Sequence, residues 1–307
     1  MATGRMTDVE RMTEAGVDMI FNKSVKMPRK KLYPMISTEK KQPKLIGKYD
    51  SLGDLTAAAV KVEGDDIPFD AIEQAYETTI TSKTVAKGVH ASREKLEYDL
   101  YGTVNSRFGV PLLKRMQQFK EIEIADCYND GFTTTGADGE YIFDTDHPLV
   151  NSDSENSNLA TGELSPDNLI DAKNMFIDIK DQAGLSFDTY PTTLLINDKK
   201  QYIAMQILES QLVAFELSNT KNVVNALEPL RVVANRYIDY TAATGVSPWF
   251  LIDDTLEDAG CILQTKKGIW LETEWIKANQ IYRGMCFEMY GSGMVAPGYK
   301  IIASTGA

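Results

Sequence analysis

The chain has 307 residues, of which 43% are hydrophobic, 25% charged and 9% aromatic, and this composition excludes a disordered or fibrous protein. Its three cysteines, Cys127, Cys261 and Cys286, form neither a CxxC pair nor an even set, which argues against a disulfide scaffold and a structural zinc site. The net charge of -12 is uneven: residues 22–48 hold nine basic residues and one acid, which gives this segment +8 and leaves -20 for the rest.

Residues 1 to about 49 predict an extended arm, because Pro28, Pro34 and Pro43 interrupt any long helix, although residues 7–21 have the spacing of a short one. A basic arm on an acidic body fits nucleic-acid contact, docking on another copy, or a solvated and partly mobile tail. The basic residues that we expect to act in assembly are Lys23, Lys26, Arg29, Lys30, Lys31, Lys40, Lys41, Lys44 and Lys48. With neither a signal-peptide core nor a run of ~18 apolar residues, we expect a soluble protein that does not contact a membrane.

Residues 55–100 contain few large aliphatic side chains. Their weak alternation predicts two strands, 73–80 and 84–90, which are joined near 81–83 into a polar ribbon. Such a ribbon has no core of its own and is only marginally stable in water. We therefore expect the ribbon and the arm to become ordered only on neighbouring subunits. The ribbon residues that we expect to make these contacts are Glu73, Tyr76, Glu77, Lys83 and Lys87.

Two long helices follow in the prediction. The first covers residues 111–129, with Gly131 as a left-handed cap and an apolar stripe formed by Leu112, Leu113, Met116, Phe119, Ile122 and Ala125. The second covers residues 166–183, with Ser165 as its N-cap, Pro166 at its first position and Gly184 after its end.

In the rest of the chain, predicted strands and helices follow one another without a regular order. Strands are predicted at 192–196, 230–238, 249–252, 268–276 and 281–290, with a third helix capped by Asp198 and a turn at Gly291 to Gly293. Because the chain has no regular βαβ alternation and no internal repeat, the pattern predicts an α+β fold.

Catalysis is not predicted. The two histidines, His90 and His147, have no serine or cysteine nucleophile motif nearby, and no phosphate-binding loop occurs. We therefore expect no catalytic residue and no cofactor.

A calcium loop is also not predicted. Asn151, Asp153 and Glu155 form the densest string of oxygen ligands, with Asp144 and Asp146 just upstream. The template glycine and its final glutamate are missing, so a solvated loop without a metal is expected.

The order of these elements carries a resemblance. A basic arm, a polar extension, a long helix ending in YNDGF (128–132) and an α+β body resemble the major capsid proteins of tailed bacteriophages with the Hong Kong 97-like fold. The resemblance covers about 55–290. Within this range, several sequence strings are similar to those of Mu-type major head subunits: EKLEYDLYG (94–102), FDTDHPLVN (143–151), LSPDNLIDAKNMF (164–176), YPTTLLINDKKQYIAMQIL (190–208) and SPWFLID (247–253).

The resemblance implies an N-terminal arm (1–54), an extended loop (55–100), a peripheral domain (101–189 and 255–290) and an axial domain (190–254 and 291–307). It implies self-assembly into hexamers and pentamers of an icosahedral shell, built in the host bacterial cytoplasm, which encloses double-stranded DNA without sequence specificity. The implied partners are a portal, a separate scaffolding protein and a decoration protein. Deleting residues 1–48 should then leave the body folded but impair the shell.

Three alternatives stay open. An encapsulin-like compartment shell has the same fold but encloses a cargo enzyme. A cytoplasmic α+β enzyme is supported only by the abundance of Asp and Glu. A nucleic-acid-binding protein would use the arm, and its binding would weaken steeply with salt.

Overall fold

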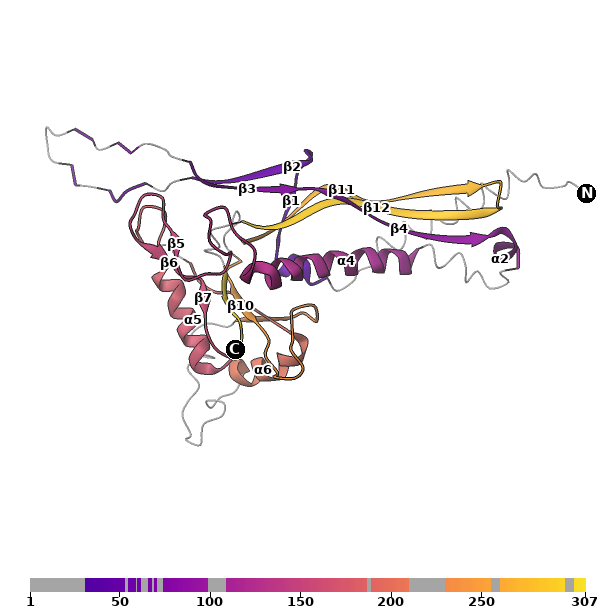
Figure 1. The fold of residues 1–307 in the computed structure, drawn as a ribbon. Helices are drawn as coiled ribbons and strands as arrows, with labels where there is room; N and C mark the ends of the chain where they lie inside the picture. Colours follow the sequence, from indigo (N-terminus) through magenta and orange to yellow (C-terminus); the bar gives the residue numbers. More distant parts are fainter. Residues whose placement is uncertain are drawn as a thin grey trace, which may run out of the picture.

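The computed structural model describes residues 31–52, 55–58, 60–61, 66–67, 69–70, 74–98, 109–186, 189–209, 230–254, 260–295 and 301–307. Within these ranges two main sheets lie on either side of the long helix α4 (Val110–Asn129), as Figure 1 shows. The mixture of helices and sheets confirms the α+β class. No helix in these ranges is long and apolar enough to cross a membrane.

The strands in the described residues form four sheets. The larger sheet has the order β1 (Thr38–Lys41), β11 (Gly260–Ile276), β12 (Ile281–Val295), β4 (Lys83–Ser92), and the smaller has the order β7 (Leu159–Ala160), β13 (Ile301–Ser304), β10 (Trp249–Ile252), β8 (Thr193–Ile196), β9 (Arg231–Ala234). Two pairs complete the set: β2 (Ile46–Leu52) with β3 (Gln74–Thr81), and β5 (His147–Pro148) with β6 (Glu155–Asn156). The helical elements are η1 (Tyr33–Met35), α2 (Arg93–Glu97), α4, η2 (Asp130–Phe132), α5 (Pro166–Asp178), η3 (Asp198–Lys200) and α6 (Gln201–Glu209).

Helix α4 confirms the strongest helix prediction and packs on the larger sheet. Leu112, Leu113 and Met116 meet Cys286 of β12 in one apolar cluster. The predicted stripe is wrong at Phe119, which is 42% exposed, while the neighbouring Lys120 is buried. The reason lies on β12, where Glu288 forms a buried ion pair with Lys120.

The end of α4 also differs from the prediction. Gly131 lies in the 3-10 turn η2 and not in the left-handed conformation. A Cβ at this position would lie 2.4 Å from the Phe143 ring. Glycine is therefore required here for close packing of the aromatic ring, not for a left-handed cap.

The smaller sheet is buried on both faces. Leu194, Ile196 and Leu251 pack with α5 and α6 in one cluster, whereas Leu195 and Phe250 pack with the end of α4 in another. Because side chains alternate between faces along a strand, a strand covered on both sides is apolar throughout. This is why the predicted strand at 249–252 is confirmed with its bounds.

Helix α5 begins as predicted, with the Ser165 hydroxyl accepting a hydrogen bond from the Asn168 backbone N–H at 3.2 Å. It ends at Asp178 and not near 183, because the backbone of Lys180 pairs with the Asn156 side chain. The Lys180 N–H donates to Asn156 Oδ1 at 2.9 Å, and Asn156 Nδ2 donates to the Lys180 carbonyl at 2.7 Å. The predicted cap Asp198 is wrong by one residue, since Asn197 accepts from the Lys199 N–H.

The predicted ribbon is wrong in its pairing. Its two strands exist as β3 and β4, but β3 pairs with β2 and β4 pairs with β12. The chain passes between them at Ser82, which is 5% exposed and accepts a hydrogen bond from Gln264 Nε2 at 2.9 Å. Strand β12 offers β4 a long antiparallel edge, so β4 joins the larger sheet.

The expectation that the arm becomes ordered only on neighbours is wrong for residues 31–52. Tyr33 and Ile36 are 6% and 3% exposed in the core, and β1 pairs in parallel with β11. Deleting residues 1–48 would therefore remove part of the core, all of β1 and the first three residues of β2, so the body is not expected to survive it. The helix predicted at 7–21 lies outside the described residues.

The turn predicted at Gly291 to Gly293 is wrong, because both residues lie within β12. The glycines allow β3 to cross close by: a Cβ at Gly291 would lie 2.7 Å from the Thr81 carbonyl oxygen, and one at Gly293 would lie 3.1 Å from Ile80. Their role is close packing between two sheets.

This packing makes a testable difference between two glycines of the same sheet. Gly291→Ala is expected to lower the free energy of unfolding by about 1–3 kcal/mol, because the added methyl meets a backbone atom. Gly268→Ala, where a Cβ meets nothing within 4 Å, is the matched control and should change it by less than about 0.5 kcal/mol. Urea unfolding of the unassembled subunit measures both, and equal values would contradict the packing role.

Candidate functional site

The described residues of the predicted arm lie on the protein's own body. Lys40 lies over the Tyr49 ring at 5.5 Å from its centroid, and Lys48 forms an ion pair with Glu77 at 2.5 Å. Hydrogen bonding and charge from Glu77 raise the pKa of Lys48, and hydrogen bonding to Lys48 lowers the pKa of Glu77. Lys31, Lys41 and Lys44 are exposed, whereas Lys23, Lys26, Arg29 and Lys30 lie outside the described residues.

The described ribbon residues lie on β3 and β4, on either side of the passage at Ser82. The Tyr76 hydroxyl donates to the Pro148 carbonyl at 2.9 Å, and Lys83 pairs with Glu123 of α4 at 2.5 Å. Lys87 is exposed on β4, and Glu73 lies outside the described residues. The structure thus brings Tyr76, Glu77 and Lys83 into contacts within one chain, and their part in assembly stays a prediction.

Beyond β2 and β3 lie the described residues between Leu55 and Asp70, which we call the extension. Figure 1 shows them reaching away from both sheets. Val60 is 94% exposed and Phe69 is 89% exposed, and Leu55 and Ile67 are more than half exposed. The two limbs are joined by Thr56, whose backbone N–H and hydroxyl both donate to Asp70 Oδ2 at 2.8 Å. These four exposed apolar side chains, gathered in one segment, make the extension a candidate interaction site.

The face of the larger sheet that points away from α4 carries a second apolar patch. Phe287 stacks on Trp270 with 5.4 Å between ring centroids, and Lys267 lies 3.7 Å from the Trp270 centroid. The neighbours of these residues, Cys286 and Leu271, face α4, so alternation places Trp270 and Phe287 on the other side. Sequence reasoning placed Trp270 and Phe287 on the predicted strands 268–276 and 281–290 but did not pair them.

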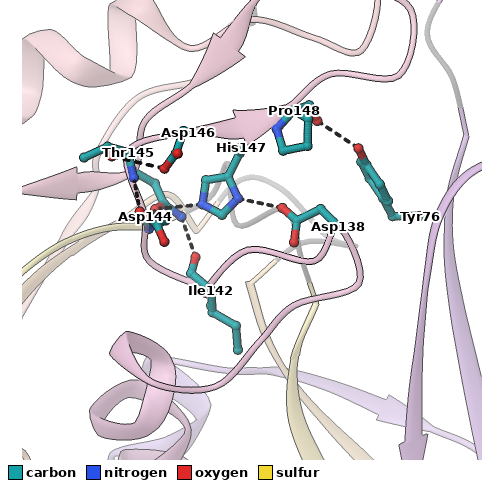
Figure 2. Close-up of polar contacts among 9 residues, drawn as sticks. Tyr76, Asp138, Ile142, Asp144, Thr145, Asp146, His147 and Pro148 are labelled. Carbon is teal, nitrogen blue, oxygen red and sulfur yellow. Dashed lines mark hydrogen bonds and ion pairs between the residues drawn. The ribbon is translucent and has the colours of Figure 1, made fainter.

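A buried polar network lies beside Tyr76, as Figure 2 shows. His147 is 1% exposed, and its Nδ1 lies 2.6 Å from Asp138 Oδ2 while its Nε2 lies 3.1 Å from Asn158 Oδ1. Burial lowers the pKa of His147, but hydrogen bonding and charge from Asp138, with smaller contributions from Asn158 and Asp144, outweigh it and raise the pKa above 6.5. Sequence reasoning had set this histidine aside because no nucleophile accompanies it.

The carboxylates expected in a solvated loop lie close by. Glu140, Asp144 and Asp146 bring their oxygens within 4.8 Å of one another at the surface. Two of them already accept hydrogen bonds from Thr145: its backbone N–H donates to Asp144 and its hydroxyl donates to Asp146. This group contains none of Asn151, Asp153 and Glu155, and an exposed acidic cluster alone identifies no metal.

Comparison with known proteins decides the family. Residues 75–279, more than half of the chain, match the family described as phage capsid protein. The chain belongs to the phage capsid protein family. No curated protein matches it by sequence.

Solved structures show the fold of this capsid protein. It is similar to the capsid structure of the cyanophage P-SCSP1u, with a TM-score of 0.59 and 14% identity over 92% of this chain and 90% of that chain. It is also similar to the capsid of a native GTA particle, with a TM-score of 0.58 and 10% identity over 92% and 93% of the two chains. The Hong Kong 97-like fold is therefore confirmed, and the protein is a subunit of a phage head shell. The closer resemblance to Mu-type head subunits stays a prediction.

One encapsulin has a related fold. The capsid protein is similar to the holo-SrpI encapsulin of Synechococcus elongatus PCC 7942, with a TM-score of 0.51 and 10% identity over 93% and 94% of the two chains. A fold likeness at 10% identity does not show a family, whereas the match to the phage capsid family does. Family membership therefore favours the phage shell over the compartment shell and gives the protein a structural role.

Proposed function

We propose that the capsid protein assembles into hexamers and pentamers of an icosahedral head shell, encloses double-stranded DNA without sequence specificity, and catalyses no reaction. The observation that supports this proposal is the exposure of Val60 and Phe69 in the extension, where both side chains are almost fully in water. A single chain gains nothing from holding these side chains in water. A second copy that covers them gains about 1.5–3 kcal/mol for each one.

The face that carries Trp270 and Phe287 is the proposed receiving surface on the neighbour. Its apolar centre is flanked by charges of both signs. Lys267 and Arg283 are balanced by Glu272, which accepts from the Trp270 indole N–H at 2.9 Å, and by Glu274, the cross-strand partner of Arg283. Burial of apolar side chains, and not net charge, is therefore what this surface offers to a neighbour. Many such contacts around a closed shell make the loss of one subunit improbable, because several must break together.

We also propose the four-part division implied by the resemblance: arm 1–54, extended loop 55–100, peripheral domain 101–189 with 255–290, and axial domain 190–254 with 291–307. In the structure α5, which this division places in the peripheral part, shares a cluster with α6 and the smaller sheet. Portal, scaffolding and decoration proteins are proposed partners of the assembled shell, formed in the host cytoplasm.

The arm can be tested with a shorter deletion than residues 1–48. Removing residues 1–30 deletes Lys23, Lys26, Arg29 and Lys30 but spares the buried Tyr33. We expect the shortened subunit to stay folded and to form fewer or less stable particles, because basic groups that would meet acidic bodies are lost. Circular dichroism checks the fold and sedimentation checks the particles. Particles of normal yield and stability would remove the arm from the account.

Negative-stain electron microscopy of the full chain, expressed alone and with a scaffolding protein, tests the proposed function. Closed particles built of rings of five and six subunits are expected. Nuclease-protected double-stranded DNA in particles from infected cells separates a genome shell from an encapsulin-like compartment, which would contain cargo protein. A folded chain that stays monomeric under all these conditions would favour the enzyme alternative.

A further inference from the structure

The buried network of His147, Asp138 and Asn158 makes none of the contacts proposed for assembly. The Asn158 side chain has a fixed orientation, because its Nδ2 donates to the Ile142 carbonyl at 2.8 Å and its Oδ1 accepts from the Asp144 N–H at 2.9 Å. Its Oδ1 therefore faces His147 Nε2. Both ring nitrogens of His147 consequently face acceptors: an amide oxygen on one side and a carboxylate on the other (Figure 2).

This geometry requires one proton more than neutral histidine and ionised aspartate hold together. A neutral imidazole donates from one nitrogen only, so the other would face an acceptor without a hydrogen between them. Asp138 depends on this proton strongly, because its side chain is fully buried and its other oxygen, Oδ1, has no partner among the described residues. Without the proton, a buried negative charge is left uncompensated, which is strongly destabilising.

The remaining charged groups around His147 do not replace that proton. Asp144, on the same loop, adds negative charge, and the residues that face it from β6 and beyond, Asn156 and Asn158, are neutral. On the β3 side the nearest titratable group is the Tyr76 hydroxyl, whose pKa is raised by burial and by Asp138. Lys180 directs its amine to the Ser154 hydroxyl.

The network is connected to β3, the strand that follows the extension, through the peptide unit of Pro148. Pro148 follows His147 directly, and its carbonyl accepts the hydrogen bond from Tyr76 of β3 at 2.9 Å. The β5–β6 pair contains only two residue pairs, His147 with Asn156 and Pro148 with Glu155, so backbone pairing alone holds this carbonyl weakly. The buried side chains of the network supply the rest.

We propose that the proton shared by His147 and Asp138 controls β3, the strand that follows the extension. With the proton present, the Pro148 carbonyl stays in place for Tyr76. Release of the proton to water loosens β3. The inference rests on the proposed function, in which the extension contacts a second copy. The pKa of His147 is raised in the folded chain, so the network contributes fully below pH 6.5 and loses its contribution as pH rises through the folded pKa.

Hydrogen exchange of the full-length protein tests this on residues 74–81, compared at pH 6 and pH 9 after correction for intrinsic rates. Protection in the natural sequence should fall severalfold at pH 9. Asp138→Asn is the matched variant, because its Nδ2 can donate to a neutral His147 ring and leaves no buried charge. It should show protection that does not depend on pH. Tyr76→Phe, which removes the link itself, should show at pH 6 the low protection that the natural sequence shows at pH 9.

Nitrogen NMR gives a direct second readout. The chain has only two histidines, so ¹⁵N-histidine labelling of a His90→Gln variant reports His147 alone. At pH 6 both ring nitrogens should carry a proton, Nδ1 toward Asp138 and Nε2 toward Asn158, and show the shifts of a doubly hydrogen-bonded imidazolium. A plainly neutral ring at pH 6, equal protection of β3 at both pH values, or unchanged pH dependence in Asp138→Asn would each overturn the proposal.

Electron microscopy of the same samples separates this inference from the proposed function. If particles form but β3 protection is the same at both pH values, the proton-dependent control is wrong and the shell stands. If no particles form at any pH, the shell proposal is wrong, while the exchange and NMR data still decide the role of the proton.

Discussion

Replacing Val60 and Phe69 together by aspartate is expected to stop particle formation while leaving the subunit folded. Both side chains are at least 89% exposed in the single chain, so their substitution removes no internal contact. In a shell each would lose about 1.5–3 kcal/mol of burial. Since about 1.4 kcal/mol is a tenfold change, the concentration needed for assembly should rise by at least about 100-fold.

Sedimentation velocity and negative-stain microscopy measure this effect at matched subunit concentrations. The control is Phe69→Leu with Val60→Ile, which keeps both positions apolar and should assemble nearly normally. Circular dichroism of the aspartate variant should match the natural sequence. Normal particles from the aspartate variant would show that the extension does not carry the contact between copies.

Lys120→Ala is expected to cost about 3–5 kcal/mol of unfolding free energy, the second large effect. The Lys120 and Glu288 side chains are only 7% and 5% exposed, and their ion pair joins α4 to β12. Tyr33 and Tyr290 lie on either side of the Lys120 amine, 5.3 and 4.8 Å from ring centroid to nitrogen. Removing the lysine leaves Glu288 charged and buried, with one carboxylate oxygen already unpartnered among the described residues.

Urea unfolding should be measured in the background of the aspartate substitutions at Val60 and Phe69, because assembly adds its own stability to the folded state. The double substitution Lys120→Met with Glu288→Leu removes both charges and should recover most of the loss, since apolar replacement of a buried pair is often neutral. A loss below about 1 kcal/mol for Lys120→Ala would show that water reaches Glu288 and replaces its partner.

Local signals predicted the elements well. Ser165 with Pro166 located the start of α5, and the continuous apolar run from Trp249 to Ile252 located β10. These signals act within a few residues of chain, where capping and alternation decide the outcome. The order of these elements was also enough to indicate the family.

Pairing and polar burial were not predictable in the same way. β3 and β4 are adjacent in sequence, which favours a hairpin, but the edges of β2 and β12 compete successfully for them. Lys120 breaks the apolar stripe of α4 because its partner is 168 residues away in the chain. The same holds for His147, whose importance depends on Asp138, Asn158 and the carbonyl of Pro148 meeting in space. Such partners become visible only once the fold is known.

The candidate site was predicted in kind and only partly in detail. The sequence indicated an extended region that needs a neighbour, but it assigned this need to the arm and the ribbon as a whole. In the structure the described arm and β3 pack on their own chain, and the unsatisfied surface is the apolar one at Val60 and Phe69. A weakly apolar string among acids, LTAAAVKVEGDDIPF (55–69), was the available signal.

A cryo-electron microscopy reconstruction of assembled particles, at a resolution that shows side chains, would locate the extension within the shell. We predict that the extension, with Phe69, lies in density against the sheet face of an adjacent subunit, close to its Trp270 and Phe287. Particles in which this ring faces solvent, or folds back on its own subunit, would contradict the account.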